Sequence, residues 1–102
     1  MSDGGFDPVI HPPARLQIMA VLAGVQDAEF ALLRKIVKVS DSVLSKHLAA
    51  LVDAGYVGLR KAALDGRQRT WVQITRPGRR AFADHVKALE ALAAVVDRMA
   101  AE

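Results

Sequence analysis

The chain contains no cysteine among its 102 residues. Disulfide bonds, thiolate metal sites and cysteine nucleophiles are therefore excluded. Long apolar runs are missing too, because the longest, IMAVLAGV and ALAAVV, are far shorter than the roughly 20 residues that cross a membrane. The opening stretch MSDGGFDPVI has neither the basic start nor the apolar segment of a secretory signal. We therefore expect a cytoplasmic protein with no membrane partner.

Signatures of catalysis and of metal binding are also lacking. The chain has neither a glycine-rich phosphate loop nor an H-E-x-x-H motif. Its histidines, His11, His47 and His85, are scattered, and no two of them have the spacing of metal ligands. Ser45 and His47 are two positions apart, and such residues do not face each other on a helix. We therefore expect neither an enzyme nor a metal site, and no cofactor.

Apolar residues are plentiful enough for one modest core. They make up 52% of the chain, which argues against a largely disordered protein. A length of 102 residues favours one domain over two. Residues 1–11 are mostly polar and include two glycines near the start, so we expect them to form a flexible arm.

The spacing of apolar residues predicts three helices in the first half of the chain. Two prolines suit the first turn of a helix over about 12–23. A short second helix of about two turns is predicted over about 30–37. Ser40 is a good N-cap for a third helix over about 41–54, which Gly55 ends in a left-handed conformation.

The outward face of the third predicted helix carries small, polar or basic side chains: Ser42, Ser45, Lys46 and Ala49. Small side chains let a backbone approach another surface closely. Hydroxyl and ammonium groups can donate hydrogen bonds to phosphates and to base edges. This face is therefore suited to contact a nucleic acid.

A basic β-hairpin is predicted to follow, turning at Asp65-Gly66. Val57 and Leu59 would form the inner face of its first strand, and residues 70–75 its second strand. Residues 55–80 hold seven basic groups against one acidic group, a local charge of +6 in a chain whose net charge is +3. Such a concentration favours a polyanion-binding surface over a solvated basic face without a partner. The basic groups are Arg60, Lys61, Arg67, Arg69, Arg76, Arg79 and Arg80.

The only tryptophan, Trp71, lies off the inner face of the predicted hairpin. It could stack on a nucleotide sugar or pack beneath the first helix, and we favour packing.

A final helix is predicted from about Arg79 to the end of the chain. Its apolar residues recur at spacings of 3-4-3-4-3, the pattern of a coiled-coil seam. An amphipathic helix packed on its own domain would show the same pattern, and we favour self-association, with residues 79–102 as a dimerisation helix. The predicted interface consists of Phe82, His85, Leu89, Leu92, Val96 and Met99.

Two short helices followed by a basic hairpin form a winged helix-turn-helix. The stretches SDSVLSKHLAALVDAGYV and DGRQRTWVQITRPGRRAF also resemble the MarR and ArsR families of bacterial winged-helix transcriptional regulators, most closely the compact, single-domain MarR-like type. LSKHLAALVDAGYV resembles their recognition helix, DGRQRTWVQIT their wing, and RPGRRAF the start of their dimerisation helix. The resemblance covers about residues 12–100.

The resemblance implies an α+β, mainly α fold with a three-helix core, a β-hairpin wing and a long C-terminal helix. It implies a DNA-binding domain over residues 12–78 and a homodimeric repressor on a palindromic operator. We expect the recognition-helix contacts to be Asp41, Ser42, Val43, Ser45, Lys46 and His47. We expect the wing and backbone contacts to be Arg60, Lys61, Arg67, Gln68 and Arg69.

Some alternatives stay open at this stage. His47 could reach a phosphate or brace the helix-turn-helix. The chain lacks the thiols of many ArsR-type metal sensors and is shorter than a typical MarR protein, so a small-molecule effector is left open. A winged helix that binds another protein is the competing class, but such a module tends to expose large apolar anchors, and the third helix shows serine, lysine and alanine instead.

Overall fold

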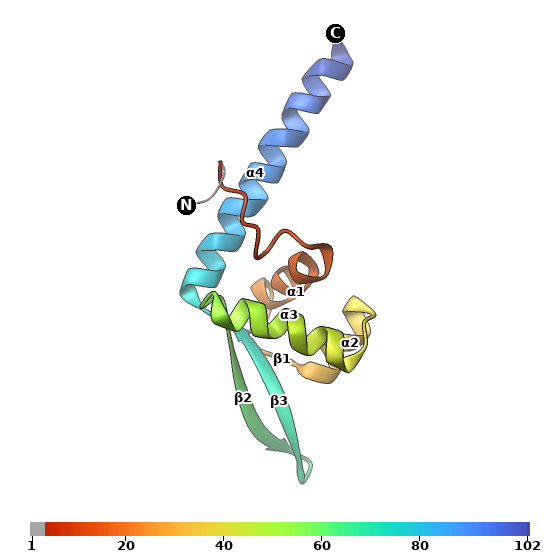
Figure 1. Ribbon diagram of the computed structural model, residues 1–102, viewed down its shortest axis with the longest axis vertical. Helices are drawn as coiled ribbons and strands as arrows, with labels where there is room; N and C mark the ends of the chain where they lie inside the picture. The colour runs from red at the N-terminus through yellow and green to blue at the C-terminus, as the bar shows by residue number, and fades with distance from the viewer. Residues whose placement is uncertain (1–3) are drawn as a thin grey trace.

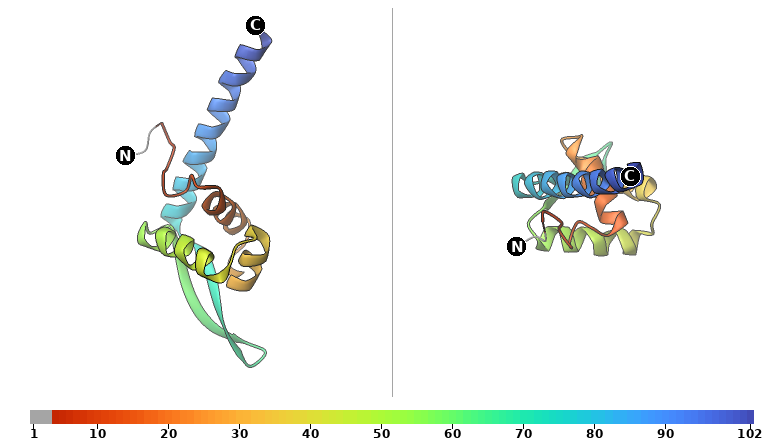
Figure 2. Two further views of the ribbon diagram at one scale, coloured as in Figure 1. Left: turned by 45° about the vertical axis from the view of Figure 1, so that its right-hand side comes forward. Right: turned by 90° about the horizontal axis from the view of Figure 1, so that it is seen from above.

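The computed structural model describes residues 4–102 and shows a small body from which a hairpin and a long helix project (Figure 1). The hairpin and the free half of the last helix extend from opposite ends of this body (Figure 2). The principal dimensions are 60 × 26 × 22 Å. In chain order the elements are α1 (Pro13–Ala23), β1 (Ala28–Glu29), α2 (Phe30–Val37), α3 (Asp41–Asp53), β2 (Val57–Leu64), β3 (Arg67–Ile74) and α4 (Arg76–Ala101).

The core lies between α1, α2, α3 and the base of the hairpin. Leu44, Leu48 and Leu51 recur along α3 at helical spacing and are buried, which fixes the face that α3 turns inward. The expected fold class, with a three-helix core and a β-hairpin, is confirmed. The other buried apolar residues of the core are Ile10, Ile18, Met19, Leu22, Ala28, Leu33, Val37, Val57 and Val72.

The ends of α3 follow the local signals in the sequence. The Ser40 hydroxyl accepts a hydrogen bond from the Val43 N–H at 3.2 Å, as an N-cap does. Gly55 has a φ of 80°, and its N–H donates to the carbonyl of Val52. Both boundaries are therefore set by backbone hydrogen-bonding needs that are local in the chain.

The sheet has three antiparallel strands in the order β1-β3-β2. Strand β1, which is absent from the expected elements, pairs Ala28 with Val72 and Glu29 with Trp71. Two residues are too few to show an alternating pattern, so no sequence signal announces it. Leu59 lies on the inner face of the sheet as expected, since it pairs with the fully buried Val72. Its side chain is nevertheless 51% exposed, because the hairpin has already left the core at that position.

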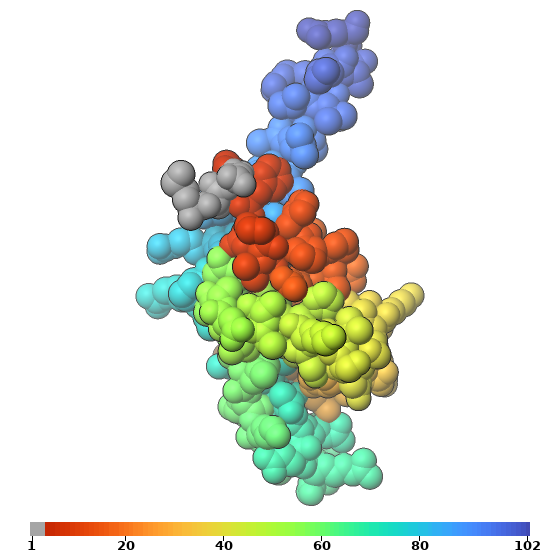
Figure 3. Space-filling view, viewed as in Figure 1, coloured from red at the N-terminus to blue at the C-terminus, as the bar shows by residue number. Residues whose placement is uncertain are grey.

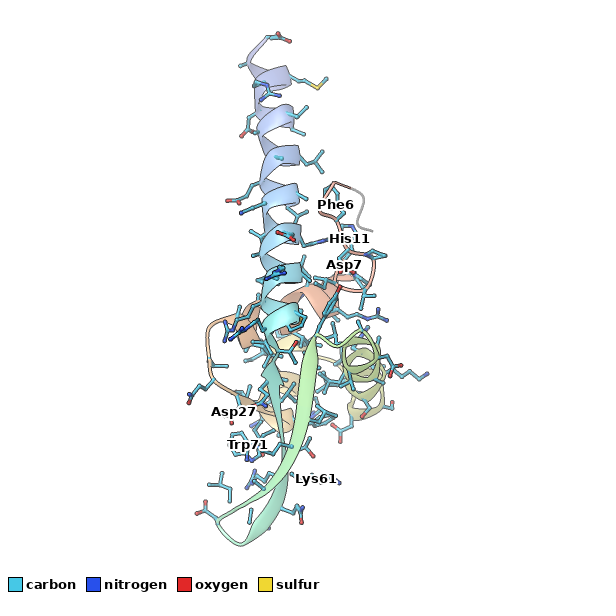
Figure 4. The ribbon with its side chains drawn as sticks, turned by 90° about the vertical axis from the view of Figure 1, so that its left-hand side faces the viewer. Phe6, Asp7, His11, Asp27, Lys61 and Trp71 are labelled. Atoms are coloured by element: carbon cyan, nitrogen blue, oxygen red, sulfur yellow. The ribbon has the colours of Figure 1, made fainter. Side chains whose placement is uncertain are left out.

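Residues 4–11 are packed against the body, which corrects the expectation of a flexible arm. Ile10 is fully buried in the core. The N–H of Asp7 donates to Nδ1 of His85 at 2.9 Å, and the Tyr56 hydroxyl donates to the Asp7 carboxylate. Phe6, Asp7 and His11 lie together beside α4 (Figure 4). The segment thus ties the start of the chain to its last helix.

His85 is the one buried polar residue of the described chain and lies under this segment. Its Nδ1 accepts from Asp7, so the ring proton of the neutral form is on Nε2, which lies 3.2 Å from Nδ1 of His11. Burial, and then the nearby His11, lower the pKa of His85 against a smaller opposing effect of Asp7. The hydrogen bond to Asp7 raises the pKa of Tyr56 to about 12.

Helix α4 begins at Arg76, three residues earlier than expected. Thr75 is its N-cap: the hydroxyl accepts from the Gly78 N–H at 3.0 Å and donates to the carbonyl of Gly55 at 2.6 Å. Pro77 falls in the first turn, where its missing N–H removes no helical hydrogen bond. The proline that ends the hairpin therefore also starts the helix.

The predicted interface along α4 is divided in two. His85 is fully buried under residues 4–11 and cannot meet a partner, which corrects its assignment. Phe82 is half-buried against the core, so its place in a dimer interface stays a prediction. Leu92, Val96 and Met99 are exposed on the half of α4 that projects from the body. Leu89 lies at the boundary and is half-buried.

Within residues 4–102, no helix combines the length and the apolar content needed to cross a bilayer.

Candidate nucleic-acid interface

The exposed face of α3 is the one expected from the sequence. Ser42, Ser45, Lys46 and Ala49 are all exposed, opposite the buried leucines. The side chain of Val43, at the edge of this face, is 40% exposed. The face is therefore small and polar, with one cation near its middle.

Asp41 lies at the start of α3 and is bound by its own chain. Its carboxylate is 3.0 Å from Nε of Arg34, at the end of α2. The two side chains are 76% and 41% exposed, so this ion pair is weak. The ion pair links the two helices of the helix-turn-helix at their junction. The Asp41 carboxylate places a negative charge beside the outer face of α3.

His47 is half-buried and hydrogen-bonded to its own chain. Nε of Arg15 donates to Nδ1 of His47 at 3.1 Å, and the same guanidinium donates to the carbonyl of Val9 at 3.2 Å. Burial, together with Arg15, lowers the pKa of His47. His47 thus braces α3 against α1, one of the two roles left open for it, while a contact between His47 and a phosphate stays a prediction.

The tip of the wing is open and positively charged. Asp65 and Gly66 have φ angles of 52° and 77°, which turn the chain tightly between β2 and β3. Arg67, Gln68 and Lys61 are exposed, and within residues 4–102 neither Arg67 nor Lys61 forms an ion pair. These groups are available to a polyanion.

Two other wing arginines are already paired, which the sequence did not reveal. Arg60 lies 2.7 Å from the Asp27 carboxylate and Arg69 lies 2.6 Å from that of Glu29. The hydrogen bond to Glu29 raises the pKa of Arg69. Both acids come from the short link that contains β1, so the excess charge of residues 55–80 is partly neutralised by residues far away in the chain.

The basic start of α4 has a partly structural role. Arg79 donates to the carbonyl of Ala23 at 3.0 Å and so joins the start of α4 to the end of α1. Arg76 and Arg80 line an open groove of about 610 Å³ with Asp7 and Tyr56. In the described part of the chain, no three histidine or acidic side chains come together as a possible metal site.

Helix α3 and the hairpin lie next to each other in space. On the face shown in Figure 3, the surface of α3 continues directly into that of the β2–β3 hairpin. Helices α2 and α3 meet at a short turn, and the hairpin follows α3 in the chain. This arrangement defines a winged helix-turn-helix protein.

The family of winged helix DNA-binding domains matches residues 14–93, and the chain belongs to this family. It is 32% identical over 78 residues to the uncharacterized protein MJ0432 of Methanocaldococcus jannaschii, covering 76% of this chain and 85% of that protein. The solved structure of a transcriptional regulator homologue from Pyrococcus horikoshii OT3 superposes with a TM-score of 0.82 at 29% identity, over 87% of this chain and 88% of that one. HlyU from Vibrio cholerae is similar at 25% identity, with a TM-score of 0.61 over 74% and 77% of the two chains.

These similarities confirm the prediction of a winged-helix transcriptional regulator. The family is one of DNA-binding domains, so the expectation that the chain is not an enzyme is confirmed as well.

Proposed function

We propose that this protein is a homodimeric repressor that binds a palindromic operator in double-stranded DNA. The observation that carries the proposal is the small, polar outer face of α3 lying beside a wing with unpaired cations. A face of this kind fits a major groove, while a cationic hairpin fits the flanking phosphates or the minor groove. Residues 12–78 would form the DNA-binding part and α4 the dimerisation part.

Within this proposal, base contacts and phosphate contacts belong to different elements. Ser42, Ser45 and Lys46 project from the exposed face of α3 and would contact base edges. Arg67 and Lys61 would hold the backbone and so fix the register of the helix. Steep dependence on salt is expected, because each neutralised phosphate releases counterions.

The proposal is tested by binding of the purified protein to labelled DNA duplexes. Random duplex should be bound at low salt and lost at moderate salt, and in vitro selection should enrich a sequence with two-fold symmetry. If no duplex is bound at low salt, the winged helix serves a protein partner instead. That second function has less support, because the middle of the outer face of α3 carries Ser42, Ser45 and Lys46, and the exposed apolar residues Val43 and Val52 lie beside it.

We expect Arg67→Ala to weaken binding to every duplex by a similar factor. The side chain is exposed at the wing tip and would contact phosphate rather than bases. The slope of log affinity against log salt should therefore become shallower by about 0.9. A fluorescence-anisotropy salt titration measures this slope. Arg98→Ala, which removes the same charge far along α4, is the control, and an unchanged slope for Arg67→Ala would show that the tip does not contact the backbone.

The dimer is supported by the projecting half of α4. Leu92, Val95, Val96 and Met99 are between 40% and 69% exposed on the half of α4 that projects from the body (Figure 1). Within residues 4–102, the segment that contains Phe6 and His11 reaches along α4 as far as Leu92. Apolar residues on one side of a projecting helix are covered most simply by the same helix of a second copy. This is a shorter seam than the one expected from the sequence.

We expect Val96→Glu to shift the protein toward monomer by raising the dimer dissociation constant at least about tenfold, since an unpaired charge would be buried in the seam. Sedimentation equilibrium measures this constant. Ala94→Glu introduces the same charge on the opposite side of the helix and should leave the dimer intact. Equal behaviour of the two variants would mean that the exposed side of α4 is not the interface.

A further inference from the structure

The face of the sheet turned away from the helices carries opposite charges at neighbouring positions. Glu29 on β1 and Arg60 on β2 both lie directly opposite Trp71 on the central strand β3, so these residues form one row across the sheet. Arg69 is two positions from Trp71 on β3 and therefore lies on the same face. Asp27, which precedes β1, lies near Trp71 (Figure 4). The Arg60 side chain reaches past the central strand β3 and donates a hydrogen bond to the Asp27 carboxylate.

The two ion pairs differ in how far they are enclosed. Arg60 and Asp27 have side chains 49% and 31% exposed, at the open edge of the sheet. Arg69 and Glu29 are 31% and 20% exposed, and Nε of Arg69 is buried with no partner among the described residues. Solvent screens this more enclosed pair less, so it should be stronger than an ordinary surface pair, although the unpaired Nε offsets part of the gain.

A carboxylate offers a guanidinium the same kind of anionic oxygens that a phosphate does. An arginine that donates to Glu29 cannot turn the same N–H groups to DNA. The wing thus has two sets of cations. Arg67 at the tip and Lys61 farther along β2 form no ion pair within residues 4–102, whereas Arg60 and Arg69 are occupied in the absence of DNA.

We propose that Asp27 and Glu29 form a latch on the wing, which holds Arg60 and Arg69 until DNA phosphates displace the two carboxylates. The latch rests on the proposed DNA-binding function. It makes the DNA contacts of Arg60 and Arg69 depend on displacement of the two carboxylates. Arg67 at the tip makes the first contact with a duplex, and Arg60 and Arg69 engage only when the duplex lies along the wing and displaces the two carboxylates. Opening the latch costs binding free energy, so the two acids lower the affinity of the protein for DNA.

The test is a double-mutant cycle on DNA affinity. Glu29→Gln keeps the size of the side chain and removes its charge, so Arg69 is free before DNA arrives. We expect it to tighten binding of a fluorescein-labelled random duplex about two- to fivefold at low salt, the range set by the strength of such ion pairs. In an Arg69→Gln background, where nothing is left to release, Glu29→Gln should change the affinity little.

The cycle separates the latch from a simple change of charge. Loss of a negative charge near DNA would tighten binding equally in both backgrounds, and equal gains would overturn the latch. No gain from Glu29→Gln in a wild type that binds DNA would overturn it too. A wild type that binds no duplex would overturn the proposed function, and the latch with it. Thermal melting verifies that each variant is folded.

The same cycle on the more exposed pair, Asp27→Asn with Arg60→Gln, keeps the test decisive if Arg69→Gln does not fold. Non-additive gains there support the latch, and additive gains overturn it.

Discussion

Replacing Gly78 with alanine is expected to destabilise the protein by at least about 3 kcal/mol. Gly78 lies in the first turn of α4, where the helix crosses the chain at Tyr56. A Cβ at this position would lie 2.1 Å from the carbonyl oxygen of Tyr56 and 2.9 Å from its carbon. That oxygen accepts a hydrogen bond from the Thr75 N–H at 3.0 Å. Moving it away from the new Cβ would break this hydrogen bond, which lies where β3 leads into α4.

Urea denaturation monitored by circular dichroism measures the loss for Gly78→Ala. Gly58→Ala is the matched control, because its Cβ would meet only the side chain of Gln73, at 3.9 Å. We expect that variant to stay within about 1 kcal/mol of wild type. Similar stabilities of the two variants would show that α4 can move away from Tyr56 at little cost.

Truncating Ile10 to alanine is expected to cost about 2–5 kcal/mol, as for other fully buried aliphatic side chains. Ile10 is 0% exposed and belongs to the main core, although it lies in a stretch whose glycines and polar residues suggest a loose arm. The Asp7 contacts with His85 and Tyr56 hold the same stretch in place. Loss of the Ile10 side chain therefore removes core packing and loosens the segment that covers His85.

The same denaturation experiment measures the cost of Ile10→Ala. Val25→Ala is the comparison, since Val25 is 41% exposed in the link after α1, and we expect a loss below about 1 kcal/mol. A loss for Ile10→Ala no larger than that of Val25→Ala would restore the view of residues 4–11 as a flexible arm.

Features governed by neighbours in the chain were predictable. Ser40 and Gly55 mark the ends of α3 because a helix leaves donors and acceptors unpaired at its ends, and these residues satisfy them within a few positions. The leucines of α3 mark its buried face for a similar reason, and the exposed serines and Lys46 follow on the opposite face. The hairpin was predictable from the turn residues Asp65-Gly66 and the alternation beside them, and its positive charge from the local composition.

Features that depend on distant partners were not predictable. His85 fits a heptad position, yet Asp7 and His11 cover it from the other end of the chain. Arg60 and Arg69 count as free cations in any sum of charge, yet Asp27 and Glu29 occupy them. These partners are too far away in the sequence for helical or strand periodicity to predict the contacts.

By itself the sequence determined the helices, the hairpin and the exposed face of α3, because helical and strand periodicity and capping act over one or two turns of chain. Only the tertiary structure decided which parts of the basic wing and of the apolar seam on α4 are free. Those choices depend on contacts between segments more than thirty residues apart, such as Arg60 with Asp27 and Asp7 with His85, which are separated by 33 and 78 positions. A sequence pattern shows which contacts a side chain is able to make. Only the fold shows whether a residue from a distant part of the chain already pairs with that side chain or covers it.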